Sequence, residues 1–533
     1  MPFQRKAHDP SQTLTLPPTS IPPRRALIAP DRAAYKWWVA VTVMLSAFLV
    51  VMSNATVNVA LPPIMTAFGL NLDQAQWVIT AYMIAGAVLI PTVGWLGNRL
   101  GNRNLFLLSL VVFVSSSALC GLAWSGTSLT LFRVVQGLGG GPITPMAMVL
   151  LNETFPARQR GLAMGLYGMS VSFGPAMGPV LAGYVTEHLS WRMVFYLNTV
   201  PGVVCILLAF LVLPSMRETV KRSLDLAGLL ALTVFLVSLL TALSQGQRYG
   251  WDAPIIQRLL VVAGVSCIAF LVLAFTRKEP LIDLRLYKDP AFAAVSLAAL
   301  IIAMAFWGTG FLQTILLQQL LGYTPAQAGF AQLPGALCMA ASTLVAGRLA
   351  DVLDRRYLIW CGLGMFALAS YWFTSLTLDR PMSWVVWMIV ARYATIGFVF
   401  TPMNAASLVL LPPERMRMGS GLLTLMQQGL GGTVGLALMT TTLQRRTLYH
   451  SMVLDQQQDF TTLGWGPVLA PTRELMVHAG EVDSMIDVKA LALLRRHLEQ
   501  HATVAAYQDC FLILAGLCVV VMPLVWFLRR RTA

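Results

Sequence analysis

The sequence predicts an all-α membrane protein in which fourteen helices cross the bilayer. Only 11% of the 533 residues are charged and 57% are hydrophobic, whereas a soluble domain carries about 25% charged residues. Charge is absent from long blocks such as Ala75–Gly97, which holds no acidic, basic or histidine residue. About 20 apolar residues in a helix match the thickness of the hydrocarbon core. The third observation is that basic residues gather in alternate loops between these blocks.

The apolar stretches place each span in order along the chain. We expect spans near residues 37–60, 75–97, 104–124, 128–150, 161–184, 192–213, 225–245, 258–276, 292–315, 326–351, 358–376, 384–411, 420–443 and 507–528. The polar segment Ser244–Arg258 joins the seventh and eighth spans. All seven cysteines lie in apolar stretches without a CxxC pair, so they are interpreted as packing residues and not as disulfide partners.

The positive charge of the chain indicates membrane topology. The net charge is +14, and 25 of the 37 lysines and arginines lie in the two tails and in the loops after even-numbered spans. An even number of spans places both termini on one side, and the positive-inside rule makes that side cytoplasmic. This distribution excludes a nucleic-acid face. The polar, Pro-rich tail 1–35 is expected to be disordered, and it shows no signal-peptide cleavage pattern.

The spans group into two halves with an insert and one long outer segment. We expect an N-terminal six-helix bundle at 36–215, a two-helix central insert at 216–280 and a C-terminal six-helix bundle at 281–533. The outer segment 444–506 is mixed in charge, and Val482–Thr503 within it is typical of an amphipathic helix that continues into the last span. An internal repeat supports the two halves, because Gly94–Arg103 resembles Gly347–Arg356, and each follows the second span of a six-span block.

Several motifs together resemble one known family. In order they are Asn58–Pro62, Gly94–Arg103, Arg133–Gly137, Gly174–Pro179, Trp191–Phe195, Asn198–Gly202 and Leu320–Pro325. Their order and spacing over residues 36–530 resemble the fourteen-helix EmrB/QacA-type drug:proton antiporters of the major facilitator superfamily. The resemblance implies two six-helix bundles, two extra central helices and alternating access around a cavity near the midplane. It also implies a bacterial inner (cytoplasmic) membrane, protons as the coupling ion, and a periplasmic adaptor with an outer-membrane channel as partners.

The loop motifs and the fifth span supply candidates for gating. Glycine permits close helix approach, and the charged residues of the loop motif form a latch that favours the outward-facing state. The first copy has Asn98 where the family usually has Asp, so we expect a weaker latch in that half. Alternatively, the arginines only enforce topology, and the glycines and prolines only pack. The gating candidates are Gly94, Asn98, Arg99, Arg103, Gly174, Pro175, Gly178, Pro179, Gly347, Asp351 and Arg355.

Polar residues inside the spans supply candidates for the substrate pathway. Arg133 lies about six residues into the fourth span, with Gln136 one turn later on a similar face. A charge at this depth is costly unless it faces a cavity or a partner; the alternative is an arginine that extends to the interface. For the amides, hydrogen bonding between helices is the competing interpretation. The pathway candidates are Asn54, Asn58, Arg133, Gln136, Gln313, Arg392, Asn404 and Gln427.

Acidic residues are missing from the interiors of the predicted spans. Ser53 stands where the family often carries Asp, and Glu153, Asp225 and Asp351 lie near span ends. Two buried arginines without a buried acid predict a neutral or weakly acidic amphipathic substrate and leave the proton-coupling site open.

Enzyme chemistry has no support in the sequence. There is no Walker A loop and no GxSxG elbow, and no cofactor or metal site is predicted. We therefore expect a secondary active exporter of amphipathic small molecules such as drugs, driven by the proton gradient. An uncoupled or differently coupled facilitator of one metabolite, and a membrane receptor or scaffold without transport, remain the alternatives.

Overall fold

Long helices dominate the computed structural model. It describes residues 34–70, 72–213, 225–277, 280, 282–377, 381–411, 416–457, 474, 478 and 483–527. The predicted disordered tail 1–35 lies outside this part of the chain, except for its last two residues. Helices suit these sequences because a helix satisfies its own backbone hydrogen bonds, which apolar surroundings cannot do.

The first bundle contains six spans. Its elements are α1 (Tyr35–Phe68), α2 (Leu72–Leu89), η1 (Ile90–Thr92), α3 (Val93–Leu100), α4 (Asn102–Gly121), α5 (Gly126–Thr154), η2 (Ala157–Gln159), α6 (Arg160–His188) and α7 (Met193–Val212). The elements α2, η1 and α3 follow one another without a break and form the second span. A capping box begins α5, where the Ser125 hydroxyl accepts from the backbone N–H of Ser128.

The second bundle repeats this plan. Its elements are η3 (Leu284–Lys288), α10 (Pro290–Ile315), η4 (Leu316–Leu320), α11 (Pro325–Val352), α12 (Arg355–Trp372), η5 (Phe373–Ser375), α13 (Met382–Val409), α14 (Met416–Thr424), η7 (Leu425–Gly431), α15 (Gly432–Gln457), α17 (Asp483–Val521) and η8 (Met522–Phe527). The packing α1–α6, α2–α5 and α4–α7 corresponds to α10–α15, α11–α13 and α12–α17. The structural repeat therefore agrees with the repeated loop motif.

Two further helices, α8 (Leu226–Tyr249) and α9 (Pro254–Thr276), form the insert. The helix α8 packs against α2 of the first bundle and α15 of the second, whereas α9 packs mainly on α8. Apolar side chains such as Val261, Val265 and Ile268 of α9 are exposed, as expected of a surface that faces lipid.

The predicted fold class is confirmed: the described chain is helical, with two bundles and two extra helices. Thirteen helices within the described residues are long and apolar enough to cross a membrane. The remaining predicted span, 161–184, corresponds to α6, which is 29 residues long and rich in glycine, serine and proline. The domain boundaries at 35/36, 215/216 and 280/281 stay predictions.

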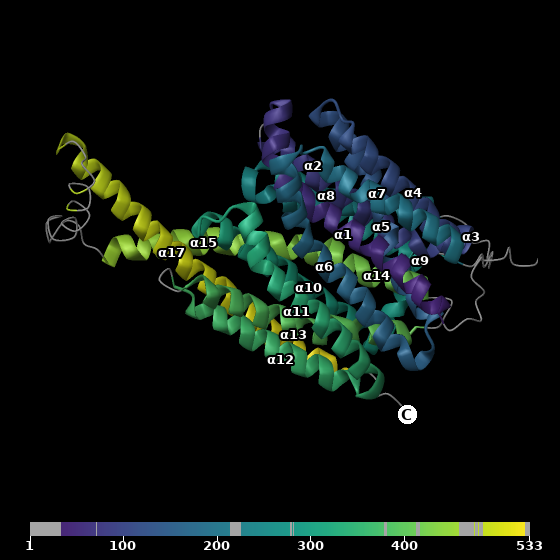
Figure 1. Ribbon diagram of the computed structural model, residues 1–533. Helices are drawn as coiled ribbons and strands as arrows, with labels where there is room; N and C mark the ends of the chain where they lie inside the picture. The colour runs from purple at the N-terminus through teal and green to yellow at the C-terminus, as the bar shows by residue number, and fades with distance from the viewer. Residues whose placement is uncertain are drawn as a thin grey trace, which may run out of the picture.

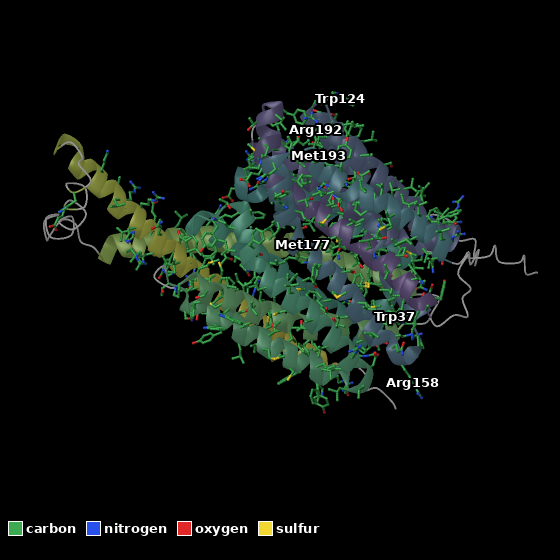
Figure 2. The ribbon with its side chains drawn as sticks, viewed as in Figure 1. Trp37, Trp124, Arg158, Met177, Arg192 and Met193 are labelled. Atoms are coloured by element: carbon green, nitrogen blue, oxygen red, sulfur yellow. The ribbon has the colours of Figure 1, made fainter. Side chains whose placement is uncertain are left out.

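The two bundles meet along α6, which lies between α1 and α11 (Figure 1). Figure 2 shows Trp37 and Arg158 at one end of the helices and Trp124 and Arg192 at the opposite end. The end with Arg158 carries the start of α6. We call it the Asp351 end, because Asp351 hydrogen-bonds the first turn of α6 there. The loops before α6 and before α7 therefore lie on opposite sides, as the span order predicts.

At the opposite end, α15 and α17 pack side by side and project beyond the other helices (Figure 1). We call these extensions, residues 444–457 and 483–506, the outer hairpin. The predicted amphipathic helix and last span form one continuous helix from Asp483, while Val482 lies outside the described residues. Asp509 binds both Arg446 Nε (2.8 Å) and His450 Nε2 (2.7 Å) and thereby joins the two helices.

Candidate functional site

A fully buried arginine lies inside the first bundle. The helix α5 carries Arg133 seven residues after it begins, and the side chain has no exposed surface. Its Nε donates to the Val78 carbonyl (3.0 Å), and its Nη1 donates to Gln136 Oε1 (2.8 Å) and Ser53 Oγ (3.3 Å). The Tyr82 ring lies 4.1 Å from the guanidinium carbon. We call these residues of α1, α2 and α5 the Arg133 cluster.

The Arg133 cluster contains no carboxylate. Ser53 Oγ also accepts from Gln136 Nε2 (3.3 Å), so one hydroxyl serves two donors. Arg133 Nη2 is buried without a hydrogen-bond partner. The ion pairs Arg446–Asp509, His450–Asp509 and Arg495–Glu499 lie elsewhere, in α15 and α17. A buried charge without a counter-ion costs several kcal/mol. The cation–π contact and the neutral hydrogen bonds of the Arg133 cluster offset part of this cost.

A second buried arginine occupies the corresponding place in the second bundle. Arg392 of α13 is 1% exposed, and its Nη2 donates to Gln313 Oε1 of α10 (2.7 Å). Aromatic rings surround its guanidinium carbon, with Tyr393 at 5.3 Å, Phe373 at 5.8 Å and Phe366 at 6.0 Å. We call these residues the Arg392 cluster. Each bundle thus directs an arginine of its fourth helix toward its first helix.

The predicted amides do not converge on one site. Asn404 of α13 and Gln427 of η7 are buried and bonded to each other, with Nε2 donating to Oδ1 at 2.9 Å. Gln427 lies in a π-helical turn, a distortion frequent at functional sites. On α1, the exposed Asn58 donates to the carbonyl of Asn54 (3.0 Å). Gln136 and Gln313 belong to the two arginine clusters.

An aromatic group where α10 meets α13 was not predicted from the sequence. The Phe306 ring makes edge contacts with Trp307 (5.4 Å), Phe400 (5.6 Å) and Tyr393 (6.2 Å) between ring centroids. All four side chains are partly buried. Such rings offer apolar area with limited conformational freedom, which suits amphipathic ligands. Aromatic residues are so common in spans that their positions alone gave no signal.

The second loop motif bonds the two bundles to each other at the Asp351 end. The Asp351 carboxylate accepts from the backbone N–H groups of Gly161 (2.7 Å) and Leu162 (3.0 Å), which begin α6. A carboxylate is favourable there because the first N–H groups of a helix lack partners and carry partial positive charge. Gly347 lies against Gly161, and a Cβ on Gly347 would come within 2.5 Å of the Gly161 carbonyl oxygen.

The first loop motif makes different contacts. The element α3, which carries Asn98, packs against α14 of the second bundle. A Cβ on Gly94 would lie 3.3 Å from Met418 Cα, so this crossing is also close. Asn152 of α5 adds a second link by donating to Met416 Sδ (3.1 Å). No carboxylate stands at position 98, so the first motif cannot repeat the charged cap that Asp351 gives to α6.

The motif arginines bond within their own bundles. Arg103 Nη2 donates to the Phe210 carbonyl of α7 (2.7 Å), and Arg355 Nη1 donates to the Ala405 carbonyl of α13 (3.3 Å). The guanidinium carbon of Arg99 lies 5.3 Å from the Trp95 ring. Among the predicted latch residues, Asp351 hydrogen-bonds across the bundle interface.

The fifth-span motif divides between two partners of α6. Gly174 and Gly178 face α1, where a Cβ on Gly178 would lie 2.6 Å from Ala55 Cβ. Pro179 faces the other bundle, since a Cβ on Gly329 of α11 would lie 3.2 Å from Pro179 Cβ. Pro175 lies within α6, as does Pro179. These residues are therefore placed where a movement between bundles would act on them.

The sequence did not single out the α6 residues that receive Asp351. Gly161 and Gly165 both pack against α11, where a Cβ on Gly165 would lie 2.7 Å from the Thr343 carbonyl oxygen. Two small residues separated by three others form the pattern that lets membrane helices approach closely, and Gly161 and Gly165 have this spacing. This spacing was the signal available in the sequence.

Comparisons with known proteins agree on one family and one fold. Residues 43–436 match the family model described as Major Facilitator Superfamily. The chain is 30% identical over 494 residues to the Escherichia coli (strain K12) multidrug export protein EmrB, with 92% of this chain and 94% of that protein covered. It is 29% identical to the Neisseria gonorrhoeae fatty acid resistance protein FarB, with 94% and 97% covered. The crystal structure of the human organic anion transporter MFSD10 has a similar fold, with a TM-score of 0.60, 14% identity, and 92% and 99% of the chains covered.

Replacing Asp351 by alanine should loosen the Asp351 end. Loss of a helix cap costs about 1 kcal/mol, and here the cap also crosses the bundle interface. We expect a longer distance between spin labels at the exposed positions Arg158 and Tyr357, measured by electron paramagnetic resonance without the native cysteines. Asp354→Ala is the matched control, because Asp354 caps α12 within one bundle. An unchanged distance in Asp351→Ala, or an equal change in the control, would contradict the assignment.

Proposed function

The chain belongs to the Major Facilitator Superfamily, and on that premise we propose that it is a secondary active exporter of amphipathic small molecules. Membership makes it a multi-pass membrane transporter and not an enzyme. Two relatives similar over more than nine-tenths of the chain are named for multidrug export and fatty acid resistance. Alternating access between two bundles is the mechanism that the family fold provides.

We propose that the substrates are neutral or weakly acidic. The observation that carries this proposal is the pair of fully buried guanidinium groups, Arg133 and Arg392, neither of which is ion-paired within the described chain. Two positive charges in a low-dielectric interior disfavour the approach of a permanent cation. The aromatic group around Phe306 supplies an apolar surface of the kind that an amphipathic tail requires.

We propose that export is coupled to protons. The position of Ser53 favours a competing function, that of an uncoupled or differently coupled facilitator. Ser53 contacts Arg133 at the place where an acid would form an ion pair. A hydroxyl does not titrate near neutral pH, whereas a carboxylate beside an arginine can exchange a proton when its surroundings change. The second candidate is therefore an uncoupled or differently coupled facilitator of one metabolite.

The proposed setting is a bacterial inner membrane with both termini in the cytoplasm. The relatives named above are bacterial, and the loops rich in Lys and Arg support a cytoplasmic position of the Asp351 end. The outer hairpin then lies on the periplasmic side. We propose that it docks an adaptor protein that leads to an outer-membrane channel, because it projects beyond the bundles and exposes Leu448, Tyr449 and Met452 (Figure 1).

The coupling proposal predicts that flux depends on an imposed pH gradient. In proteoliposomes that contain the purified protein and a weakly acidic amphipathic dye, we expect a gradient to accelerate dye movement several-fold and dissipation of the gradient to abolish the effect. Equal flux with and without the gradient would support the facilitator instead. Retained dye binding without any flux would indicate a receptor or scaffold and contradict both transport proposals.

The docking proposal predicts a separation between resistance and transport. Leu448→Ser with Met452→Ser should abolish drug resistance in cells while flux in proteoliposomes stays within about twofold, because the changed side chains lie outside both arginine clusters. The control pair is Leu438→Ser on α15 and Val519→Ser on α17, two exposed residues that lie within the spans and not in the outer hairpin. Normal resistance in the Leu448/Met452 variant would count against docking on the hairpin.

A further inference from the structure

The Arg392 cluster contains three buried N–H donors without a hydrogen-bond partner of ordinary geometry among the described residues. Arg392 is 1% exposed and Gln313 is fully buried. Arg392 Nε and Nη1 and Gln313 Nε2 are all buried without a hydrogen-bond partner. Buried donors are nearly always satisfied in folded proteins. Three such donors on two side chains that already touch each other indicate a missing acceptor.

The charge of Arg392 is also unbalanced. The ionisable groups that interact with it are the Tyr393 hydroxyl and the thiol of Cys518 on α17, and both carry their protons near neutral pH in the ordinary case. The Tyr393 hydroxyl points toward Gln332 Oε1 of α11, at 3.5 Å. Rings of Phe366, Phe373 and Tyr393 stabilise the cation. The Tyr393 hydroxyl also hydrogen-bonds Arg392, but a neutral hydroxyl leaves the charge unbalanced.

We propose that a small monovalent inorganic anion, chloride being the abundant example, binds between Arg392 and Gln313 inside the second bundle. An anion accepts from free N–H groups on one edge of the guanidinium group and also balances its charge, whereas a water molecule accepts hydrogen bonds and leaves the charge unbalanced. The anion acts as the counter-ion and hydrogen-bond acceptor of Arg392, as a carboxylate does where a buried arginine has an acidic neighbour. This site uses Arg392, on which the proposed substrate class also rests, but its test measures anion binding and not export, so the two proposals can fail separately.

The size of the anion follows from the burial of the cluster. Aromatic side chains of α12, α13 and η5 and the Gln313 amide of α10 surround the guanidinium group. A compact ion can occupy such a place, whereas the head group of an amphipathic substrate would need the helices to separate. The Arg133 cluster differs, because Arg133 makes three hydrogen bonds and leaves only Nη2 without a partner.

The test compares full-length protein in sodium chloride with protein in sodium gluconate at equal ionic strength. For the wild type, we expect the midpoint of thermal unfolding to rise with the logarithm of chloride concentration, as binding to the folded state requires, and bromide to act likewise. Gln313→Glu is the decisive variant, because it keeps the side-chain shape and adds the missing negative charge. We expect Gln313→Glu to lose the chloride dependence and to match the chloride-bound wild type in gluconate.

Ser53→Asp is the matched control, since it gives an acid to the other buried arginine. We expect it to keep the chloride dependence of the wild type. Loss of that dependence in Ser53→Asp but not in Gln313→Glu would place the ion at Arg133 and overturn the assignment. A wild type that is insensitive to chloride would overturn the proposal altogether. If Gln313→Glu fails to fold, the anomalous signal of bromide in wild-type crystals provides the test. We expect a peak between Arg392 and Gln313, and the absence of this peak would contradict the proposal.

Discussion

A guanidinium group buried in the centre of each bundle constrains the rest of this protein. Arg133 and Arg392 have at most 1% of their surface exposed and meet no carboxylate among the described residues. Each is retained by amide oxygens and aromatic rings, which offset only part of the cost of removing a charge from water. The interior of both bundles is therefore electropositive. The proposed substrate class and the proposed anion site both follow from these two arginines.

The interface between the bundles depends on a different principle, the close approach of backbones. Glycines allow α6 to pack between α1 and α11, and Asp351 then caps the start of α6 from the other bundle. The related position in the first motif, Asn98, cannot supply a charge. The weaker latch expected in the half that carries Asn98 stays a prediction.

Sequence patterns predicted the parts of the structure that depend on local properties. Spans follow from runs of apolar residues, and the contact between Arg133 and Gln136 follows from their spacing of three on a helix. The bond between Arg392 and Gln313 joins residues 79 positions apart, and the bond of Asp351 to Gly161 spans 190 positions. Such pairs arise from bundle packing, which no local pattern encodes. The aromatic group around Phe306 escaped prediction for the same reason.

We propose that the electropositive interior selects against cationic substrates. The most direct test compares two ligands that differ only in charge. One ligand carries a carboxylate and the other a quaternary ammonium on the same apolar tail, and their affinities for the purified protein are measured by calorimetry. The account predicts that the carboxylate binds at least about tenfold more tightly, which corresponds to about 1.4 kcal/mol. Equal affinities, or tighter binding of the ammonium, would contradict it.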